Sequence, residues 1–157
     1  MLNIGQKVFL ADYGAGYIQD IDMKEHSNIN NKYINIYLLL DDMNFMIPID
    51  KIVNHKIRNV LNEVELQEVL STISNHTQGI ESNWNNRYRS NKKKIQSGDT
   101  LKMCQVITDL YYLKGQDMLP PGEVKILERV EGMVASEIML VLGIDMEQAL
   151  RRIRDLV

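Results

Sequence analysis

The sequence lacks the features that mark a secreted or a membrane protein. Of its 157 residues only Cys104 is a cysteine, so no disulfide can form within the chain, and a reducing cytoplasm is the expected location. No apolar run approaches the roughly 20 residues that span a bilayer. The first residues also lack the basic start and the long apolar stretch of a signal peptide. We therefore expect a cytoplasmic protein that makes no membrane contact.

Motifs for catalysis and for metal binding are missing as well. The three histidines, His26, His55 and His76, lie in different segments without the HxH or HxxxH spacing of a metal site. Cys104 has no partner in a CxxC motif and fits a core thiol on a helix. No glycine pattern of a phosphate-binding loop is present. We expect no enzymatic activity, no catalytic residue, no metal site and no cofactor.

The first 60 residues have the composition of short β-strands. Five segments are rich in β-branched, aromatic or apolar residues, the last more weakly than the others: 7–10, 17–21, 33–40, 45–49 and 56–58. Phe45 and Ile47 are expected to face the core, while Asn44 and Met46 alternate with them. Pro48 cannot donate to a ladder, so it belongs at a sheet edge or at a strand end. Five short strands in this length favour a small, strongly bent barrel of the SH3 or Tudor type.

From about residue 63 the spacing of apolar residues changes to that of amphipathic helices. The first stripe has apolar residues at i, i+3, i+4 and i+7: Leu66, Val69, Leu70 and Ile73. Similar stripes predict four more helices. Ser82 or Asn83 caps the second, Asp99 the third and Asp145 the last. The long fourth helix follows two prolines and ends at Gly143.

This change of period divides the chain into two parts. A chain of this length can form two small domains, and its content of 45% hydrophobic and 25% charged residues is typical of a globular protein. We predict an α+β protein in two domains. A small five-stranded SH3/Tudor-like β-barrel occupies residues 1–60, and an all-α bundle of about five helices occupies residues 61–157.

The densest run of positive charge lies in the second predicted helix. Residues 81–102 contain six basic residues and two acidic ones, a local charge of +4 in a chain of net charge −3. The run also holds Trp84, the only tryptophan. This combination indicates nucleic acid, because phosphates bind Lys and Arg while an aromatic ring can stack on a base or wedge between base pairs. The pattern alone also allows a buried Trp84, since it shares a helix face with Tyr88 and Ile95.

Several short motifs occur in an order that matches one known family. In the first part they are Ile4-Gly5-Gln6-Lys7-Val8-Phe9, Tyr13-Gly14-Ala15-Gly16, Ile47-Pro48 and Ile57-Arg58. In the helical part they are Asn83-Trp84, Arg87-Tyr88, Ser97-Gly98-Asp99, Asp109-Leu110 and Gly122-Glu123. With these motifs the chain resembles the CarD/CdnL bacterial transcription regulators nearly from end to end.

The resemblance implies a polymerase-binding surface on the first domain. This would be the Tudor-like RNA-polymerase-interacting domain shared with transcription-repair coupling factors, which binds the β-subunit lobe of bacterial RNA polymerase through an exposed strand edge. Lys24, Asn44 and Met46 would contact polymerase. Some relatives carry arginine where this chain has Lys24 and Met46. Lys24 keeps the charge and Met46 loses it, so we expect a contact that is less electrostatic or shifted.

For the helical domain the resemblance implies contact with promoter DNA at the upstream edge of the melted −10 region. Trp84 matches the family tryptophan that resembles a wedge in the minor groove. Its ring would offset the loss of base stacking, worth on the order of 1–3 kcal/mol per base. Arg89 matches a phosphate contact, whereas Asn86 stands where relatives often carry arginine. The predicted DNA-binding residues are Trp84, Asn85, Asn86, Arg87, Arg89, Lys92 and Lys93.

Two functions remain open from the sequence. The first is a non-enzymatic regulator that binds the polymerase β subunit and promoter DNA and stabilises the open complex. Its DNA binding would be weak, largely independent of sequence and located in the minor groove. The second is a protein–protein adaptor, in which the barrel binds a partner and the helices are a scaffold without DNA contact. A buried Trp84 would favour the adaptor, and we expect a monomer.

Overall fold

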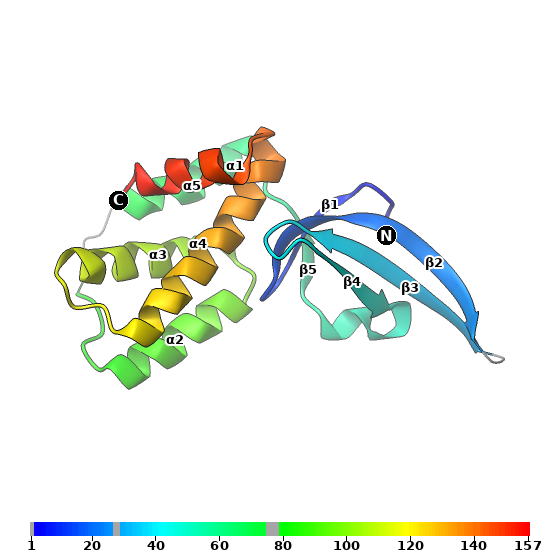
Figure 1. Ribbon diagram of the computed structural model, residues 1–157, viewed down its shortest axis with the longest axis horizontal. Coiled ribbons are helices and arrows are strands. Elements are labelled where there is room, and N and C mark those ends of the chain that lie inside the picture. The colour runs from blue at the N-terminus through cyan, green and yellow to red at the C-terminus, as the bar shows by residue number, and fades with distance from the viewer. Residues whose placement is uncertain (1, 27–28, 75–78) are drawn as a thin grey trace.

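The computed structural model shows a curved β-sheet beside a bundle of helices (Figure 1). It describes residues 2–26, 29–74 and 79–157, and for 22–26, 29–31 and 74 it describes the backbone alone. The change from strands to helices falls between β5 (Ile57–Asn59) and α1 (Glu63–Ser71). The predicted α+β fold in two parts, with strands first and helices second, is confirmed.

The sheet is antiparallel, with its five strands in the order β4-β3-β2-β1-β5. The other four strands are β1 (Lys7–Leu10), β2 (Gly14–His26), β3 (Ile29–Leu38) and β4 (Met43–Pro48). In the described part of the chain β4 and β5 lie at opposite edges and do not pair, so the predicted five-stranded barrel is present as a bent sheet that stays open. The 3-10 helix η1 (Ile49–Asn54) connects β4 to β5 and packs against β3 and β4. The predicted strong bend is present, since β2 and β3 curve together (Figure 1).

Each predicted strand overlaps an observed one, but β2 is much longer than the predicted 17–21 because it pairs with β3 along most of its length. Pro48 ends β4 at the sheet edge, as predicted. Ile47 is fully buried and Phe45 packs on the sheet core, whereas Met46 is exposed. The predicted orientation of this strand is therefore confirmed.

The sheet has an apolar core of its own. Its buried members are Val8, Leu10, Ile18, Ile34, Ile36, Leu38 and Ile47. Most of them alternate along their strands, as expected where one face of a sheet is packed. Gly16 allows β2 and β3 to approach closely, because a Cβ at this position would lie 2.0 Å from the carbonyl oxygen of Tyr37. A larger residue would require the two strands to move apart.

The described residues form five α-helices after the sheet, which confirms the predicted number. After α1 come α2 (Trp84–Gln96), α3 (Thr100–Gly115), α4 (Pro121–Leu142) and α5 (Met146–Arg154). The side chains of Asn83, Asp99 and Asp145 cap α2, α3 and α5, because each accepts a hydrogen bond from an N–H of the first turn. Helix α4 ends at Gly143, whose φ of 67° is left-handed. Within the described ranges, no helix has the length and apolar character needed to cross a membrane.

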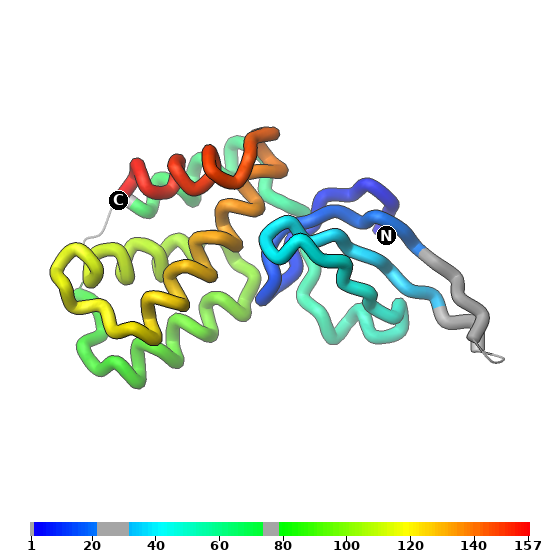
Figure 2. Tube along the Cα trace, viewed as in Figure 1, coloured from blue at the N-terminus to red at the C-terminus, as the bar shows by residue number. Residues whose placement is uncertain are grey.

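Helix α4 is the central element of the helical part. It packs against α1, α3 and α5 and also against β2 of the sheet (Figure 2). The helical core therefore includes two residues of the sheet, Phe9 and Ala15. Helix α4 also buries three carboxylates: Glu123, Glu131 and Glu137. Since a buried carboxylate needs a partner, each of them constrains which side chain of a neighbouring element faces α4.

Candidate nucleic-acid interface

Trp84 is the first residue of α2, and it is 60% exposed. Asn83 caps the helix: the Asn86 N–H donates to Asn83 Oδ1 at 3.1 Å. The Asn83 N–H in turn donates to Glu81 Oε1 at 3.0 Å. These two hydrogen bonds hold the first turn, so the indole ring stands at the end of the helix with much of its surface open to solvent.

Burial along α2 increases away from Trp84. Tyr88, one turn further, is half-buried against the helical core, and Ile95 is buried. Trp84 shares their face but precedes the packed part of it, so the buried Trp84 that the pattern allowed is excluded. The Lys92 ammonium lies 5.1 Å from the centre of the Tyr88 ring, within reach of a cation–π interaction. Tyr88 thus supports the helix from the core side.

The solvent face of α2 is basic. Arg89, Lys92 and Lys93 are exposed on it, together with Asn85 and Asn86. Helix α2 contains no acidic residue, so these charges are not neutralised within the helix. The face combines donors for phosphate groups with an exposed aromatic ring, which is the combination that nucleic-acid contacts use.

Arg87 does not belong to this face. It is 7% exposed, and its Nε and Nη2 donate to the two carboxylate oxygens of Glu123 at 2.8 and 2.6 Å. Its Nη1 donates to the carbonyl oxygen of Glu81 at 2.8 Å. Hydrogen bonding to Glu123 raises the pKa of Arg87 above its ordinary value, so the side chain stays charged. Arg87 was expected at the DNA surface from the run of charge, and the structure places it instead in the packing between α2 and α4.

The sequence analysis named Glu123 only as part of the Gly122-Glu123 motif and gave it no role, although it holds α2 in place. A signal for it exists in the sequence. Glu123 lies four residues before Leu127, which puts a carboxylate on the apolar stripe of α4, where it needs a buried cation. Because the ion pair joins the N-terminal ends of α2 and α4, it also helps to determine where Trp84 stands.

The other predicted surface lies on β4. Asn44 and Met46 are exposed on this strand, which forms one edge of the sheet. Two apolar residues that the sequence analysis missed follow on η1, where Ile49 is exposed and Val53 is 86% exposed. Lys24, the third predicted polymerase contact, belongs to the part of β2 whose side chains lie outside the described residues.

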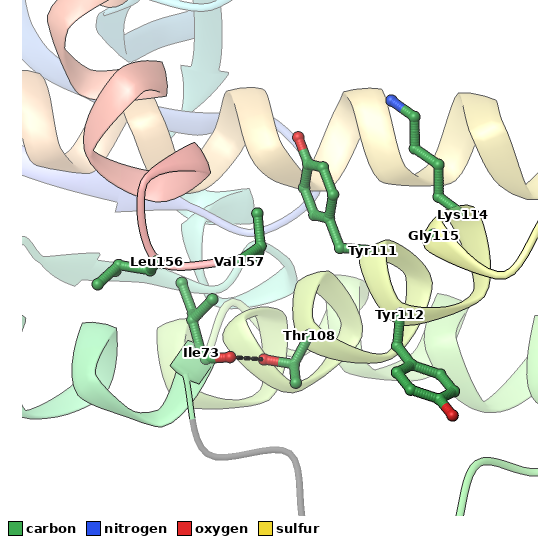
Figure 3. A pocket seen from close by; sticks show the side chains of 8 residues that line it. All are labelled: Ile73, Thr108, Tyr111, Tyr112, Lys114, Gly115, Leu156 and Val157. Atoms are coloured by element: carbon green, nitrogen blue, oxygen red, sulfur yellow. Dashed lines mark hydrogen bonds between the residues drawn. The ribbon is translucent and has the colours of Figure 1, made fainter.

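A cavity of about 570 Å³ opens at the C-terminal end of α3 (Figure 3). It is lined by Ile73, Thr108, Tyr111, Tyr112, Lys114, Gly115, Leu156 and Val157. The Thr108 hydroxyl donates to the carbonyl oxygen of Ile73 at 3.2 Å, and the Tyr111 hydroxyl donates to Glu131. This lining contains none of the residues that the sequence predicts for a functional site.

The structure also places Cys104 and the residue types that could bind a metal ion. Cys104 is buried in the helical core, as predicted, and burial raises the pKa of its thiol to about 12. A thiol with that pKa stays protonated and is a poor nucleophile. In the same part of the chain, no group of three or more His, Cys, Asp or Glu side chains is placed to hold a metal ion.

Two family models match the chain. Residues 2–61 match the CarD-like/TRCF RID domain, and residues 68–154 match the CarD C-terminal domain. The chain is also 28% identical over 148 residues to a protein of Bacillus subtilis (strain 168) named "Putative transcription factor YdeB". That alignment covers 94% of this chain and 97% of the relative, so the likeness extends over both the sheet and the helices.

Proposed function

Because the chain belongs to the CarD family of transcription regulators, we propose that it binds RNA polymerase through the sheet and promoter DNA through α2. One observation carries this proposal. Trp84 is exposed at the start of α2, beside three exposed basic side chains, on a helix without acidic residues. An adaptor whose helices serve only as a scaffold has no need for an exposed tryptophan in that place.

Trp84 would act at the upstream edge of the melted −10 region. An indole that is largely exposed can stack on the last base pair of the duplex and replace the stacking lost when the strands separate. Because the ring favours the open form alone, it shifts the equilibrium toward the open complex without any enzymatic step. A contribution on the order of 1–3 kcal/mol corresponds to a change of roughly 5- to 150-fold in that equilibrium.

The basic face of α2 would hold the DNA backbone beside this wedge. Arg89, Lys92 and Lys93 supply the charge, and Asn85 and Asn86 offer hydrogen bonds to phosphate or sugar. Contacts of this kind orient a protein on DNA but carry no sequence information. Binding to free DNA should therefore be weak, tolerant of sequence and steeply dependent on salt.

We assign polymerase binding to the edge formed by β4. The outer N–H and C=O groups of an edge strand can pair with a strand of a partner, here the β-subunit lobe of RNA polymerase. Met46, Ile49 and Val53 add exposed apolar surface on β4 and η1, which fits a contact that is less electrostatic than in relatives. Asn44 is exposed on the same strand, and Lys24 stays a sequence-based prediction for this contact. The match of residues 2–61 to the RID domain supports polymerase as the partner.

The two surfaces would work together. Binding to polymerase raises the effective concentration of α2 at the promoter, so that a weak DNA contact is sufficient. The same contact made without polymerase would be occupied rarely. Because polymerase brings α2 to the promoter, the basic face does not need side chains that recognise individual bases.

The test is the lifetime of the open complex that a bacterial RNA polymerase forms at a ribosomal promoter. We expect the wild-type protein to lengthen it and Trp84→Ala to lose most of that effect. Arg89→Ala should weaken the effect less, because it removes one phosphate contact and leaves the wedge. Val64→Ala is the matched control, since Val64 is apolar and 68% exposed but lies on α1.

Binding of each variant to purified polymerase is measured alongside. If the wild type and Trp84→Ala bind polymerase equally and neither changes the lifetime, the wedge is refuted and the adaptor becomes the better account. A loss of the same size from Val64→Ala would contradict the assignment to Trp84.

A further inference from the structure

An ion pair between a half-buried arginine and a buried glutamate joins the sheet to the helical bundle. Glu137 of α4 is fully buried, and each of its carboxylate oxygens accepts two hydrogen bonds. Oε2 accepts from Arg58 Nη1 at 2.6 Å and from the backbone N–H of Leu61 at 2.9 Å. Oε1 accepts from Arg58 Nη2 at 3.1 Å and from the Thr100 hydroxyl. The carboxylate is therefore fully satisfied without water.

Arg58 of β5 uses all five of its N–H groups. Two of them bind Glu137. The other three donate to the carbonyl oxygens of Gly98 and Asn59, at 2.8 and 3.0 Å, and to the hydroxyl of Thr100 at 2.6 Å. The guanidinium carbon also lies 4.4 Å from the centre of the Phe9 ring. A lysine could not reproduce this arrangement, because its three donors share a single nitrogen.

One of these bonds ties the sheet directly to the candidate DNA-binding helix. Gly98 lies two residues beyond the end of α2, and Arg58 binds its carbonyl oxygen. Gly98 has a φ of 71°, and a Cβ there would lie 3.2 Å from the Cβ of Ala11 in the turn between β1 and β2. The turn after α2 is thus packed against the sheet as well as hydrogen-bonded to it.

Further contacts continue along α4. The buried N–H of Ala15 donates to Ser136 Oγ at 2.8 Å. Nearer the middle of α4, Arg129 donates to both carboxylate oxygens of Asp41 at 2.7 and 3.0 Å, and to the carbonyl oxygen of Asp12 at 2.9 Å. Domains that move freely are joined by segments that few contacts cross. Here the crossing contacts are polar and specific: the Ala15–Ser136 bond is buried, the Arg58–Glu137 pair is partly buried, and the Arg129–Asp41 pair lies nearer the surface.

We propose that Arg58 and Glu137 are positioning residues, which hold the sheet and α2 in one fixed arrangement so that polymerase bound at β4 places Trp84 at the promoter. The consequence for Trp84 rests on the function proposed above, but the fixed arrangement itself does not. A fixed connection between the sheet and α2 keeps Trp84 at one place relative to polymerase and so gives a high effective concentration at the DNA. A loose connection would spread Trp84 over a larger volume and lower that concentration. The ion pair would therefore link polymerase binding to the position of the wedge.

The arrangement is tested on the full chain by pulsed electron paramagnetic resonance. Nitroxide labels are placed at Lys51→Cys on η1 and Ser90→Cys on α2, both exposed positions. We expect one narrow distance distribution in the otherwise wild-type protein and a broad one in Arg58→Gln and in the milder Arg58→Lys. Arg154→Gln is the matched control. It removes an arginine from another ion pair with a buried glutamate, Glu131, but one that lies within the helical part.

The consequence for function is tested with the same substitutions in unlabelled protein. Arg58→Lys should lose most of the gain in open-complex lifetime while its affinity for polymerase stays within about twofold of wild type, well under the tenfold that 1.4 kcal/mol would produce. Adding Trp84→Ala to Arg58→Lys should change little further. Arg154→Gln should keep the gain, which separates positioning from a general loss of stability.

The outcomes separate the two proposals. A broad distribution in the wild type overturns the fixed arrangement, and a narrow one in Arg58→Lys overturns the assignment of that arrangement to Arg58. Broadening together with an unchanged open-complex lifetime in Arg58→Lys overturns the positioning role. If the distribution broadens as expected but the wild type lengthens no open complex, the fixed arrangement stands and the proposed function fails. Circular dichroism identifies a variant that does not fold, and Arg58→Lys then carries the test without Arg58→Gln.

Discussion

The sheet and the helical bundle have cores of different kinds. Among the residues that the structure describes, every buried polar or charged side chain lies in the helical part, and the buried members of the sheet core are apolar. Three of the buried charges are glutamates of α4, each paired with an arginine from another element: Glu123 with Arg87, Glu131 with Arg154 and Glu137 with Arg58.

These pairs give the helical core a specificity that apolar packing lacks. Apolar burial is non-directional, and cores tolerate exchange of one apolar side chain for another of similar volume. A buried carboxylate with one cationic partner is less tolerant, because a shift of either element leaves a charge unpaired. We interpret the three pairs as selecting one arrangement of α2, α5 and β5 around α4. They need not be the main source of stability.

The largest expected effect comes from breaking one pair. Glu123→Leu leaves the Arg87 guanidinium buried without its carboxylate, and arginine cannot lose its proton to relieve the charge. We expect a loss of about 3–5 kcal/mol in the free energy of unfolding, measured by urea denaturation. The double variant Arg87→Leu/Glu123→Leu should recover much of that loss, since an apolar pair of similar volume can replace a buried ion pair.

Glu128→Leu provides the control for this prediction. Glu128 is exposed on the same helix, and surface substitutions of this kind usually change stability by less than about 0.5 kcal/mol. Equal losses in Glu123→Leu and in the double variant would mean that the shape of the side chains, and not the unpaired charge, determines the effect.

The sequence predicted the parts of the molecule that depend on local pattern. Strand composition, helical stripes and capping residues are all set within a few neighbours, so the five helices and the caps at Asn83, Asp99 and Asp145 could be placed. Closure of the barrel depends on whether two edge strands meet, which local pattern does not determine. For that reason the sequence analysis expected a barrel, whereas the structure has an open sheet.

In the candidate site, too, local pattern predicted some features, while others depend on residues far away in the chain. Arg87 and Arg89 stand two residues apart in one run of charge, yet Arg87 is buried and Arg89 is exposed. The partner that buries Arg87 is 36 residues away in the chain, so the charge run gave no sign of it. Exposure of Trp84 likewise depends on where the neighbouring helices begin, and the spacing of α2 alone left it open.

A smaller effect is expected from substitutions in the sheet core. There a second substitution should add to the loss of stability, whereas in the Arg87–Glu123 pair it should recover part of it. Ile36→Val removes one methylene from a fully buried residue and should lower the free energy of unfolding by about 0.5–1.5 kcal/mol in urea denaturation. Ile18 is the buried partner of Ile36 across β2 and β3. Ile18→Val should add to the loss, because no unpaired charge exists for a second substitution to remove. Recovery in the double variant would show that the two cores do not differ in the way inferred.

The smallest effect at neutral pH is expected from Tyr111→Phe. The Tyr111 hydroxyl donates to Glu131, but Arg154 remains paired with that carboxylate in the variant. We therefore expect a loss of only about 0.5 kcal/mol, the low end of the net worth of a hydrogen bond. Burial, and next the hydrogen bond to Glu131, raise the pKa of Tyr111 from 10 to about 12. The folded protein thus favours the neutral phenol more than the unfolded chain does.

This raised pKa makes the difference between wild type and Tyr111→Phe depend on pH. The stabilisation by the neutral phenol is fully present below pH 10 and is lost as the pH rises through about 12, because the unfolded chain releases the proton first. The advantage of the wild type should shrink above pH 10 and then reverse in favour of the variant, as measured by urea denaturation at pH 7, 9 and 11. Ile36→Val is the control from the sheet core, since no ionisable group is changed and its deficit should stay constant over the same range. If the deficit of Tyr111→Phe also stays constant, the pKa of Tyr111 is not raised in the folded protein and its ionisation does not affect stability.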